Sequence, residues 1–491
     1  VGLGGSASVP ITGGGSGGGG GWSNQPVTSY QDNGCGGGRE GGKSSNILVV
    51  HSGSILTLGD NSSAISAQSL GGSGGAAGMS GTLAGSVTTI GNPAALSVGS
   101  SSNGGHGGVA GDVNIQAQDT KKAALNNAAL IVTLGNESTG ILARSVGGAG
   151  GAGANTGVLS GSAGKVTYDG AIAYGGNGGD GGNAGNVTIS SNDSILTAGN
   201  NASGIIAASV GGAGGNVGDT AAVALEAGVQ LKSYGGFGAI GGSGGKGGSS
   251  GNATVTFGGN LNTYGAQSSG IDVSTTGGNG GNAGRILGAG ISVMPNGFNL
   301  GGSVGGAGGQ GGAAGAAIVN FGGTLVTKGE ASSGIVAKTT GGNGGSGAFE
   351  ISAALGQLGA NNVALAWGRA AGNGGVAGDI NINTSGSIST EGKDSDAILA
   401  LSAGGKGGVA QRAIAGTIGA QSSAKNTSVS VAFAGGGGAG AASGNIAVIN
   451  QANIYTKSSG ARDIVALSEG GLAVLGARRL LLLLLLLVLV P

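Results

Sequence analysis

The residues from Gly175 to Asn183 come nearest to a ligand-binding motif. They read GGNGGDGGN, which is similar to the calcium nonapeptide G-G-x-G-x-D-x-U-x, where U is a large apolar residue. Gly182 stands where that apolar residue is needed, so the match is incomplete. In other copies of the repeat described below, the position of Asp180 is filled by Glu40, His106, Lys246, Gln310, Asn373 and Ala439. This position holds cationic residues in some copies and alanine in another, so it does not supply a calcium ligand in each copy. We predict no metal site.

Other sequence patterns that carry chemistry are missing. The phosphate-binding loop G-x-x-x-x-G-K-[ST] does not occur, and G-x-G-x-x-G is expected by chance where 124 of 491 residues are glycine. His51 and His106 are the only histidines, and their spacing is not typical of zinc sites. Serine is abundant, but no motif pairs it with a histidine base, as nucleophilic catalysis requires. We predict no catalytic residues, no cofactor-binding residues and no cofactors, and we expect that the protein is not an enzyme.

Composition indicates a folded chain. Disordered segments are poor in aliphatic residues and often carry a large net charge, whereas this chain is 38% hydrophobic and 8% charged, with 20 basic and 20 acidic residues. With 5 prolines and no strict G-X-Y register, a collagen helix is excluded. Because the charges balance, the chain has no excess of basic residues with which to bind nucleic acid, so we expect no nucleic-acid partner. Cys35 is the only cysteine, so stability must come from packing.

One pattern recurs seven times along the chain, and TAGNNASGIIAASVGGAGG at residues 197–215 is its clearest copy. A marker glycine occupies positions 59, 135, 199, 265, 329 and 392, with Ser458 in the seventh copy, so successive spacings are 76, 64, 66, 64, 63 and 66. A second apolar element starts 14 residues before the marker in six copies, and the second copy has ten more residues, around QDTKKAALNN, which indicate a loop insertion. We therefore divide the chain into a Gly/Ser-rich segment (1–35), seven repeats of about 66 residues (36–479) and an apolar poly-Leu tail (480–491).

Apolar residues in both elements alternate with a period of two, which is typical of strands. Ile205, Ala207 and Ser209 share one face, as do Val187 and Ile189 upstream. The opposite face accepts charged, polar and apolar residues alike, so it faces solvent or an assembly partner. Helical periodicity is absent, and we predict an all-β fold, a parallel β-solenoid with glycine-rich turns and two to three coils in each 66-residue repeat.

A column of threonines suggests an ice-binding array at first sight. Its members are Thr57, Thr133, Thr197, Thr263, Thr327, Thr390 and Thr456. Each lies two residues after an inward isoleucine or leucine, so strand parity predicts that the threonines also point into the core.

Glycine runs such as GGNGGDGGNAG, which precede the upstream strands, repeat every three residues. Three residues per turn is the period of polyproline II, so Gly-Gly-x segments could pack side by side through backbone hydrogen bonds with x outward. The alternative is that these runs only form the corners of the coils.

The two ends of the chain differ from the repeats. The sequence begins without Met or an apolar signal segment, so we expect a processed or truncated chain. The eleven apolar residues from Leu480 to Val490 fall short of a bilayer span, and we expect no membrane span in this chain. Eight successive leucines are also consistent with a placeholder for undetermined sequence.

The repeat T-x-G-x-x-x-S-G-I-x-A-x-S-x-G-G-x-G-G resembles the glycine-rich repeats of bacterial autotransporter-type surface proteins, here without that family's membrane barrel. The resemblance implies a β-helix outside the cell, so we expect an extracellular or cell-surface location. It covers residues 36 to about 475 and brings no catalytic motif.

We expect a structural protein that self-associates into a homopolymer, a rod or filament of stacked solenoids, each about 100 Å long at three coils per repeat. Leu401, Tyr455 and Leu467 fit an end or lateral contact. The alternative is an adhesin that binds cell-surface glycans or a host surface, for which Tyr168, Tyr174, Tyr234 and Phe237 are candidate residues. A polysaccharide lyase is a third reading, but the sequence shows no recurring acidic cluster.

Overall fold

The structure is a computed structural model that describes residues 27–31, 36–87, 94–117, 130–164, 166–227, 232–293, 296–357, 360–420, 427–474 and 480–486. Within these ranges every regular element is a strand, and the strands form five sheets of seven. All pairs of neighbouring strands are parallel, as the pairing of β14 (Ile205–Val210) with β19 (Ile271–Thr276) illustrates. The predicted all-β parallel solenoid is confirmed.

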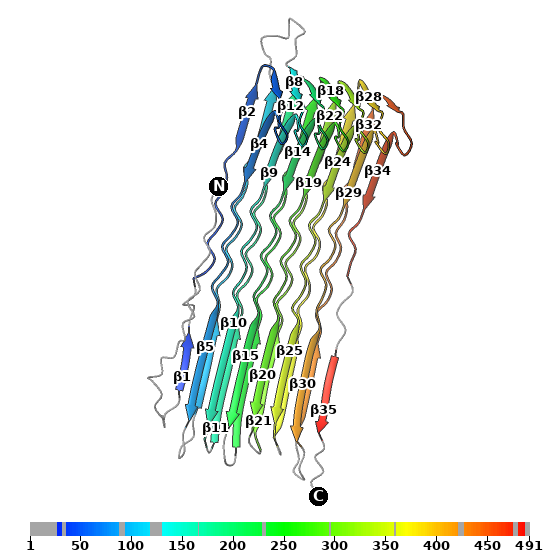
Figure 1. The fold of residues 1–491 in the computed structure, drawn as a ribbon. Coiled ribbons are helices and arrows are strands. Elements are labelled where there is room, and N and C mark those ends of the chain that lie inside the picture. The colour runs from blue at the N-terminus through cyan, green and yellow to red at the C-terminus, as the bar shows by residue number, and fades with distance from the viewer. Residues whose placement is uncertain are drawn as a thin grey trace.

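Three sheets make up one end of the molecule, which we call the head (Figure 1). Head sheet I consists of β2 (Ile47–His51), β7 (Val113–Ala117), β12 (Val187–Ser191), β17 (Ala253–Phe257), β22 (Ala317–Phe321), β27 (Ile380–Thr384) and β32 (Ile446–Asn450). Head sheet II consists of β3 (Ile55–Thr57), β8 (Leu130–Thr133), β13 (Ser194–Thr197), β18 (Asn260–Thr263), β23 (Thr324–Thr327), β28 (Ser387–Thr390) and β33 (Asn453–Thr456). Head sheet III consists of β4 (Ile65–Leu70), β9 (Ile141–Val146), β14, β19, β24 (Ile335–Thr340), β29 (Ile398–Ala403) and β34 (Ile464–Glu469).

The remaining two sheets form the opposite end, the tip (Figure 1). Tip sheet I consists of β1 (Val27–Gln31), β6 (Ala94–Ser100), β11 (Val166–Tyr174), β16 (Lys232–Ile240), β21 (Phe298–Val304), β26 (Asn361–Trp367) and β31 (Ser428–Phe433). Tip sheet II consists of β5 (Ser80–Val87), β10 (Thr156–Ala163), β15 (Thr220–Ala227), β20 (Ile286–Ser292), β25 (Glu350–Gly356), β30 (Ala413–Ala420) and β35 (Leu480–Leu486). Two of these strands come from the terminal segments of the sequence, since β1 pairs with β6 and β35 pairs with β30.

Each repeat forms one coil, so the expectation of two to three coils per repeat is wrong. A single coil passes through all five sheets before the chain returns to the same sheet one repeat later, as the register Ile205↔Ile271 shows. Seven strands spaced by about 4.8 Å span only about 29 Å in the stacking direction, so the 100 Å rod is also wrong. The long dimension of the molecule instead runs along the strands (Figure 1).

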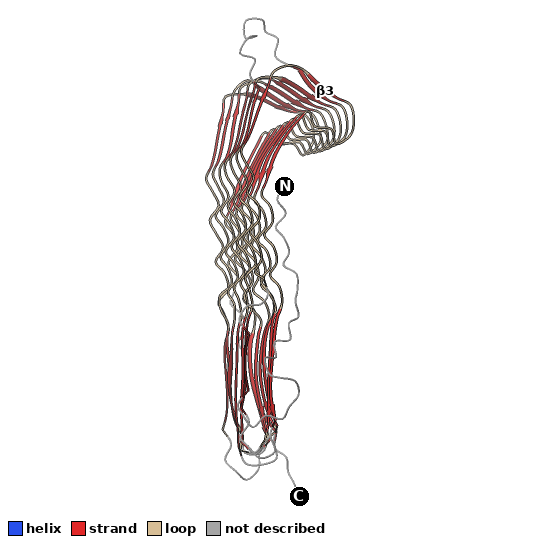
Figure 2. Ribbon diagram, turned by 90° about the vertical axis from the view of Figure 1, so that its left-hand side faces the viewer, coloured by secondary structure: helices blue, strands red, loops and turns tan. Residues whose placement is uncertain are grey.

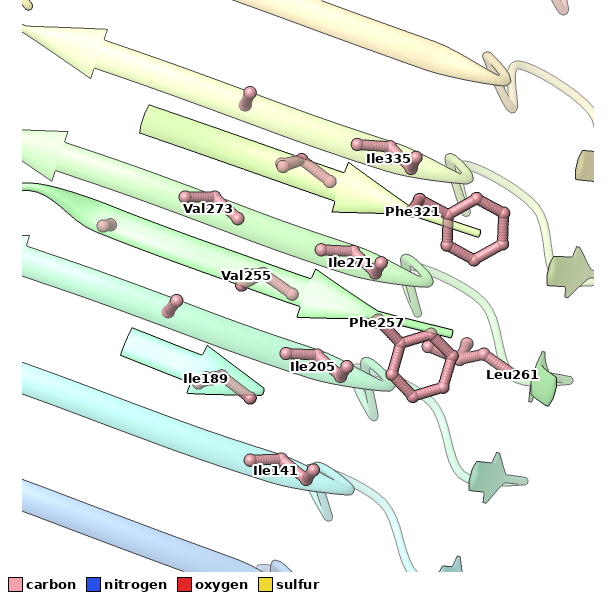
Figure 3. Close-up of a cluster of buried hydrophobic side chains, with 14 of the residues drawn as sticks. Ile141, Ile189, Ile205, Val255, Phe257, Leu261, Ile271, Val273, Phe321 and Ile335 are labelled. Atoms are coloured by element: carbon pink, nitrogen blue, oxygen red, sulfur yellow. The ribbon is translucent and has the colours of Figure 1, made fainter. Parts of the chain in front are cut away.

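The head encloses an apolar core, with columns of like residues running from coil to coil. Ile141, Ile205, Ile271 and Ile335 form one column and are fully buried (Figure 3). The predicted inward threonines are confirmed for the central coils, where Thr133, Thr197, Thr263, Thr327 and Thr390 are fully buried.

Between head and tip, the glycine runs form two antiparallel layers that we call the shaft (Figure 2). The Gly211 N–H donates to the carbonyl of Thr276 in the next coil at 2.8 Å, and the Gly212 N–H donates to the carbonyl of Gly182 in the other layer at 2.9 Å. This pattern repeats three residues later, and the third residue of each triplet points outward. The shaft therefore matches the first of the two alternatives, Gly-Gly-x segments that pack side by side through backbone hydrogen bonds with a repeat of three residues.

The shaft requires glycine because its two layers and its coils approach so closely. A Cβ on Gly211 would overlap the carbonyl of Gly248 in the other layer, and a Cβ on Gly212 would overlap the carbonyl of Gly148 in the preceding coil. Each of the two glycines in a triplet is therefore needed for its own steric reason, one for the approach of the two layers and the other for the approach of successive coils.

A serine or threonine column joins the head to the shaft. The Ser209 hydroxyl donates to the Gly185 carbonyl at 2.8 Å and accepts from the Gly251 N–H at 2.8 Å. Because Gly185 and Gly251 belong to successive coils, this hydroxyl fixes both the layer spacing and the coil register. That contact explains the serine in the Ile-x-Ala-x-Ser pattern.

Candidate functional site

The acidic glycine run lies in the shaft, where Asp180 takes part in contacts between coils. Its backbone N–H donates to His106 Nδ1 at 3.0 Å, and its Oδ1 accepts from the Lys246 N–H at 2.7 Å. No cluster of three or more metal-binding side chains occurs in the part of the chain that the structure describes. The other histidine, His51, ends β2 in the head and does not belong to this column.

The same contact recurs wherever asparagine or aspartate fills the outward position of a triplet. The Asn279 Oδ1 accepts from the Asn343 N–H at 2.8 Å, and the Asn343 Oδ1 accepts from the Lys406 N–H at 2.9 Å. Such a side chain satisfies the third N–H of a triplet in the next coil, the one donor that the glycine network leaves free. The polar residues of the shaft therefore support the fold.

Three buried carboxyl groups lie inside the described part of the tip, where no site was predicted from the sequence. Asp169, Glu226 and Glu350 point between the two tip sheets and are 7%, 2% and 0% exposed. They are separate from one another in sequence and come from β11, β15 and β25. Asp169 contacts the Ser160 hydroxyl across the sandwich.

Burial disfavours the charged form of these carboxyl groups. It raises the pKa of Asp169 to about 6, against a smaller opposing effect of its hydrogen bond from Ser160. Burial likewise raises the pKa of Glu226 to about 7, and hydrogen bonding to Ser233 partly offsets it. Burial raises the pKa of Glu350 to about 8, although nearby backbone groups and Arg369 lower it. The interior of the tip thus favours neutral carboxyl groups.

The outward face of tip sheet I carries large apolar and aromatic side chains. Tyr168 and Tyr234 are 47% and 42% exposed and stack with ring centroids 5.3 Å apart. Trp367 is 60% exposed and contacts Phe433 with ring centroids 5.1 Å apart. Tyr174 is also exposed on this sheet.

Only three of the four aromatic residues proposed for an adhesin surface lie on that face. Phe237 is buried between the tip sheets, because its position in β16 differs in parity from that of Tyr234. Its ring occupies the space beside Gly290 and Gly301, which have no side chains.

In the last coil that the structure describes, core side chains of the head are exposed. Ile464 continues the isoleucine column but is 44% exposed, whereas Ile398 in the preceding coil is fully buried. Tyr455 and Leu467 are 61% and 55% exposed in the same coil, and Leu401 one coil earlier is half-buried. Core side chains of the first coil, such as Ile55, are also only partly buried.

No family model and no curated protein matches the chain. Among solved structures, the nine polyproline type II helical bundle springtail antifreeze protein from Granisotoma rainieri is 19% identical over 55% of this chain and 100% of its own, with a TM-score of 0.08. That score does not indicate a common fold. Across the described ranges, no helix has the length and apolar character needed to cross a membrane.

Proposed function

We propose that the protein is a structural repeat protein that extends by stacking, coil on coil, into a filament. The observation that carries this proposal is the open core at Ile464, an isoleucine 44% exposed at the end of a column whose other members are almost fully buried. A further coil placed on β34 would bury this side chain as Ile398 is buried one coil earlier.

Backbone hydrogen bonding favours the same mode of growth. All five sheets end in strands that pair on one side only, such as β34 in head sheet III and β31 in tip sheet I. The Ile398 N–H donates to the Asp463 carbonyl at 3.0 Å, and Ile464 occupies the equivalent position one coil later. An exposed edge of this kind is a template for another strand.

The proposed location is extracellular or on a bacterial cell surface. The support for it is the resemblance of the repeat to those of autotransporter-type surface proteins, together with a parallel solenoid architecture. Low charge and the small number of titratable groups suit a structural role better than a catalytic one.

The adhesin alternative has less support. Phe237 is buried, and Tyr168 and Tyr234 stack on each other, so each ring has only one face free for a sugar. Binding to a glycan array that is lost in Tyr168→Ala and Tyr234→Ala would favour this alternative over a purely structural role.

Electron microscopy of the purified chain tests the stacking proposal. The wild-type protein is expected to form filaments with an axial repeat near 4.8 Å, the spacing of paired strands. The variant Ile464→Lys should remain a single particle, because a lysine placed in the core column would be buried without a partner after stacking.

The variant Leu467→Lys is the matched control. Leu467 lies in the outward column of the same strand, where Lys338 occurs naturally and is exposed. This variant should therefore still form filaments. Single particles in the wild type at every concentration, or filaments in Ile464→Lys, would contradict the proposal.

A further inference from the structure

The tip has polar side chains among the small apolar residues of its interior and larger apolar side chains on its outward faces. Inward positions hold hydrogen-bonded pairs of hydroxyl and amide groups, such as Ser233 with Ser292 at 2.6 Å and Asn299 with Asn362 at 3.2 Å. Glu226 and Glu350 also point inward. The tip interior therefore mixes these polar groups with an apolar cluster that includes Val158, Phe237 and Ile286, whereas the head core is a continuous apolar cluster.

The outward faces of the tip are almost free of charge. Along tip sheet II, every outward position from β5 to β30 is glycine, alanine, valine, leucine or isoleucine. The described strands of the tip contain four charged residues, of which Asp169, Glu226 and Glu350 point inward. Lys232, at the start of β16, is the one that remains outside. An apolar surface of this extent, on both faces of one unit, indicates an apolar environment.

The outward apolar positions of the tip strands form a band across the tip, which we call the apolar band. Charged residues lie at the end of this band next to the shaft. Asp219, Arg285 and Arg412 are exposed and directly precede β15, β20 and β30, and Arg369 follows β26 on the other sheet. Apart from β1 and β31, which have five and six residues, the tip strands have seven to nine residues, and at about 3.3 Å per residue they give a band about 23–30 Å long, which is close to the hydrocarbon thickness of a bilayer.

Aromatic residues form two rows across tip sheet I, one near each end of the band. Tyr168, Tyr234 and Phe298 occupy one register, as the pairing of β11, β16 and β21 shows. Trp367 and Phe433 occupy the register nearer the shaft, six residues further along, together with Tyr174. Aromatic rows at both borders of an apolar band are typical of sheets embedded in lipid.

A surface hollow lies at the end of the shaft that adjoins tip sheet II, and an apolar groove lies on the sheet itself. The hollow has a volume of about 490 Å³ and is lined by Arg285, Phe349 and Gln411 among others. The groove has a volume of about 190 Å³, and its lining includes Ile351 and Ile418. Phe349 lines the hollow and Ile351 lines the groove, and the two residues are two positions apart on one face, so the hollow and the groove lie near each other.

We propose that the tip is embedded in a phospholipid bilayer, with the charged border of the shaft at the level of the headgroups. In this arrangement the hollow beside Arg285 accepts a phosphate group, and the groove along β25 and β30 accepts an acyl chain. A second copy of the chain packed face to face explains the surface less well, because one such contact covers only one of the two apolar faces.

Insertion also requires partners for the edge strands of the tip, since an unpaired strand edge is strongly unfavourable in hydrocarbon. The edges at β31 and β5 are open on one side. Stacking of copies supplies those partners, so this part of the inference rests on the proposed function.

Trp367 provides a probe of insertion, because the chain has only one other tryptophan, Trp22. In a Trp22→Phe protein, mixing with vesicles of phosphatidylcholine and phosphatidylglycerol should shift the emission of Trp367 to shorter wavelength. Bromine atoms on the acyl chains should quench that emission. The protein should also float with the vesicles in a density gradient.

A pair of charge substitutions tests whether the outward face is responsible. Leu300→Asp combined with Leu365→Lys places opposite charges on β21 and β26, at positions 46% and 43% exposed, so folding in water should persist. Vesicle binding should fall at least tenfold. The matched control combines Thr256→Asp with Asn320→Lys, which are exposed and paired across β17 and β22 in the head, and should bind as the parent does.

The outcomes separate the two proposals. Flotation with bromine quenching supports insertion, and filaments without vesicle binding overturn insertion alone. Vesicle-bound single particles contradict stacking and, with it, insertion of the unpaired strand edges, and would show that the outward apolar faces bind only at the bilayer surface. An emission shift without bromine quenching, together with dimers that the double variant Leu300→Asp and Leu365→Lys abolishes, would show that a second copy covers the tip and would overturn insertion.

Discussion

At the scale of single residues, the buried threonines of the head point into the core as predicted, but their hydroxyl groups have no hydrogen-bond partner. The Thr197 hydroxyl is fully buried and has no hydrogen-bond partner, and Thr133 and Thr263 repeat this arrangement in neighbouring coils. Strand parity predicted the inward direction from the sequence, because these threonines share a face with the preceding isoleucine or leucine. The missing partner depends on packing and could not be predicted.

Replacing Thr197 with valine should stabilise the protein. The substitution keeps the branched shape of the side chain and removes a buried hydroxyl without a partner, so the free energy of unfolding should rise by about 1–2 kcal/mol. Urea denaturation followed by circular dichroism measures the change. The control Thr188→Val, on the outward side of β12, should alter stability by less than about 0.5 kcal/mol. Equal effects of both variants would show that burial is not the cause.

The buried carboxyl of Glu350 should make stability depend on pH. Its pKa is raised from 4.5 to about 8, so the folded state binds more protons than the unfolded state between these values. The free energy of unfolding should therefore fall as pH rises from about 5 to 8, by roughly 2–4 kcal/mol. Urea midpoints measured across this range in wild type and Glu350→Gln test this. The variant should have a flatter profile, and an unchanged slope would contradict the assignment.

At the scale of elements, the head strands could be predicted and the tip strands could not. Head strands keep an apolar inward face in every repeat, so their period of two is visible in the sequence. In β15 the inward residues are Thr220, Ala222, Ala224 and Glu226, and the larger apolar side chains point outward. A strand with small and polar residues inward and larger apolar residues outward cannot be recognised from an apolar inward face.

Within the shaft, glycine should be essential at the two inner positions of a triplet and dispensable at the third. Gly212→Ala places a methyl group against the Gly148 carbonyl, so it should lower the free energy of unfolding by more than about 3 kcal/mol. Ala213→Ser changes the adjacent exposed position and should have an effect within about 0.5 kcal/mol. Thermal unfolding of both variants measures the difference, and a mild effect of Gly212→Ala would show that the layers can separate.

At the scale of the whole molecule, the repeat length was visible in the sequence but the number of coils per repeat was not. A 66-residue spacing between marker glycines is compatible with one long coil or with several short ones. The marker column also shows why the spacing is kept, since a Cβ on Gly199 would overlap the carbonyl of Gly135 in the preceding coil. The two arrangements can be distinguished only if it is known that the shaft lengthens each coil. The sequence does not show this, because glycine triplets are compatible with tight corners and with extended layers.

Removing one complete coil should leave a folded protein with six coils. Deletion of residues 205–270 removes 66 residues and joins Gly204 to Ile271, which then occupies the register of Ile205. Because each coil contacts only its neighbours, the circular dichroism spectrum should keep its shape. Solution scattering should show a thickness reduced by about 4.8 Å. Deletion of residues 205–226, one third of a repeat, is the control and should prevent folding, since it removes β14 and most of β15. A folded product from this shorter deletion would mean that a repeat contains several coils.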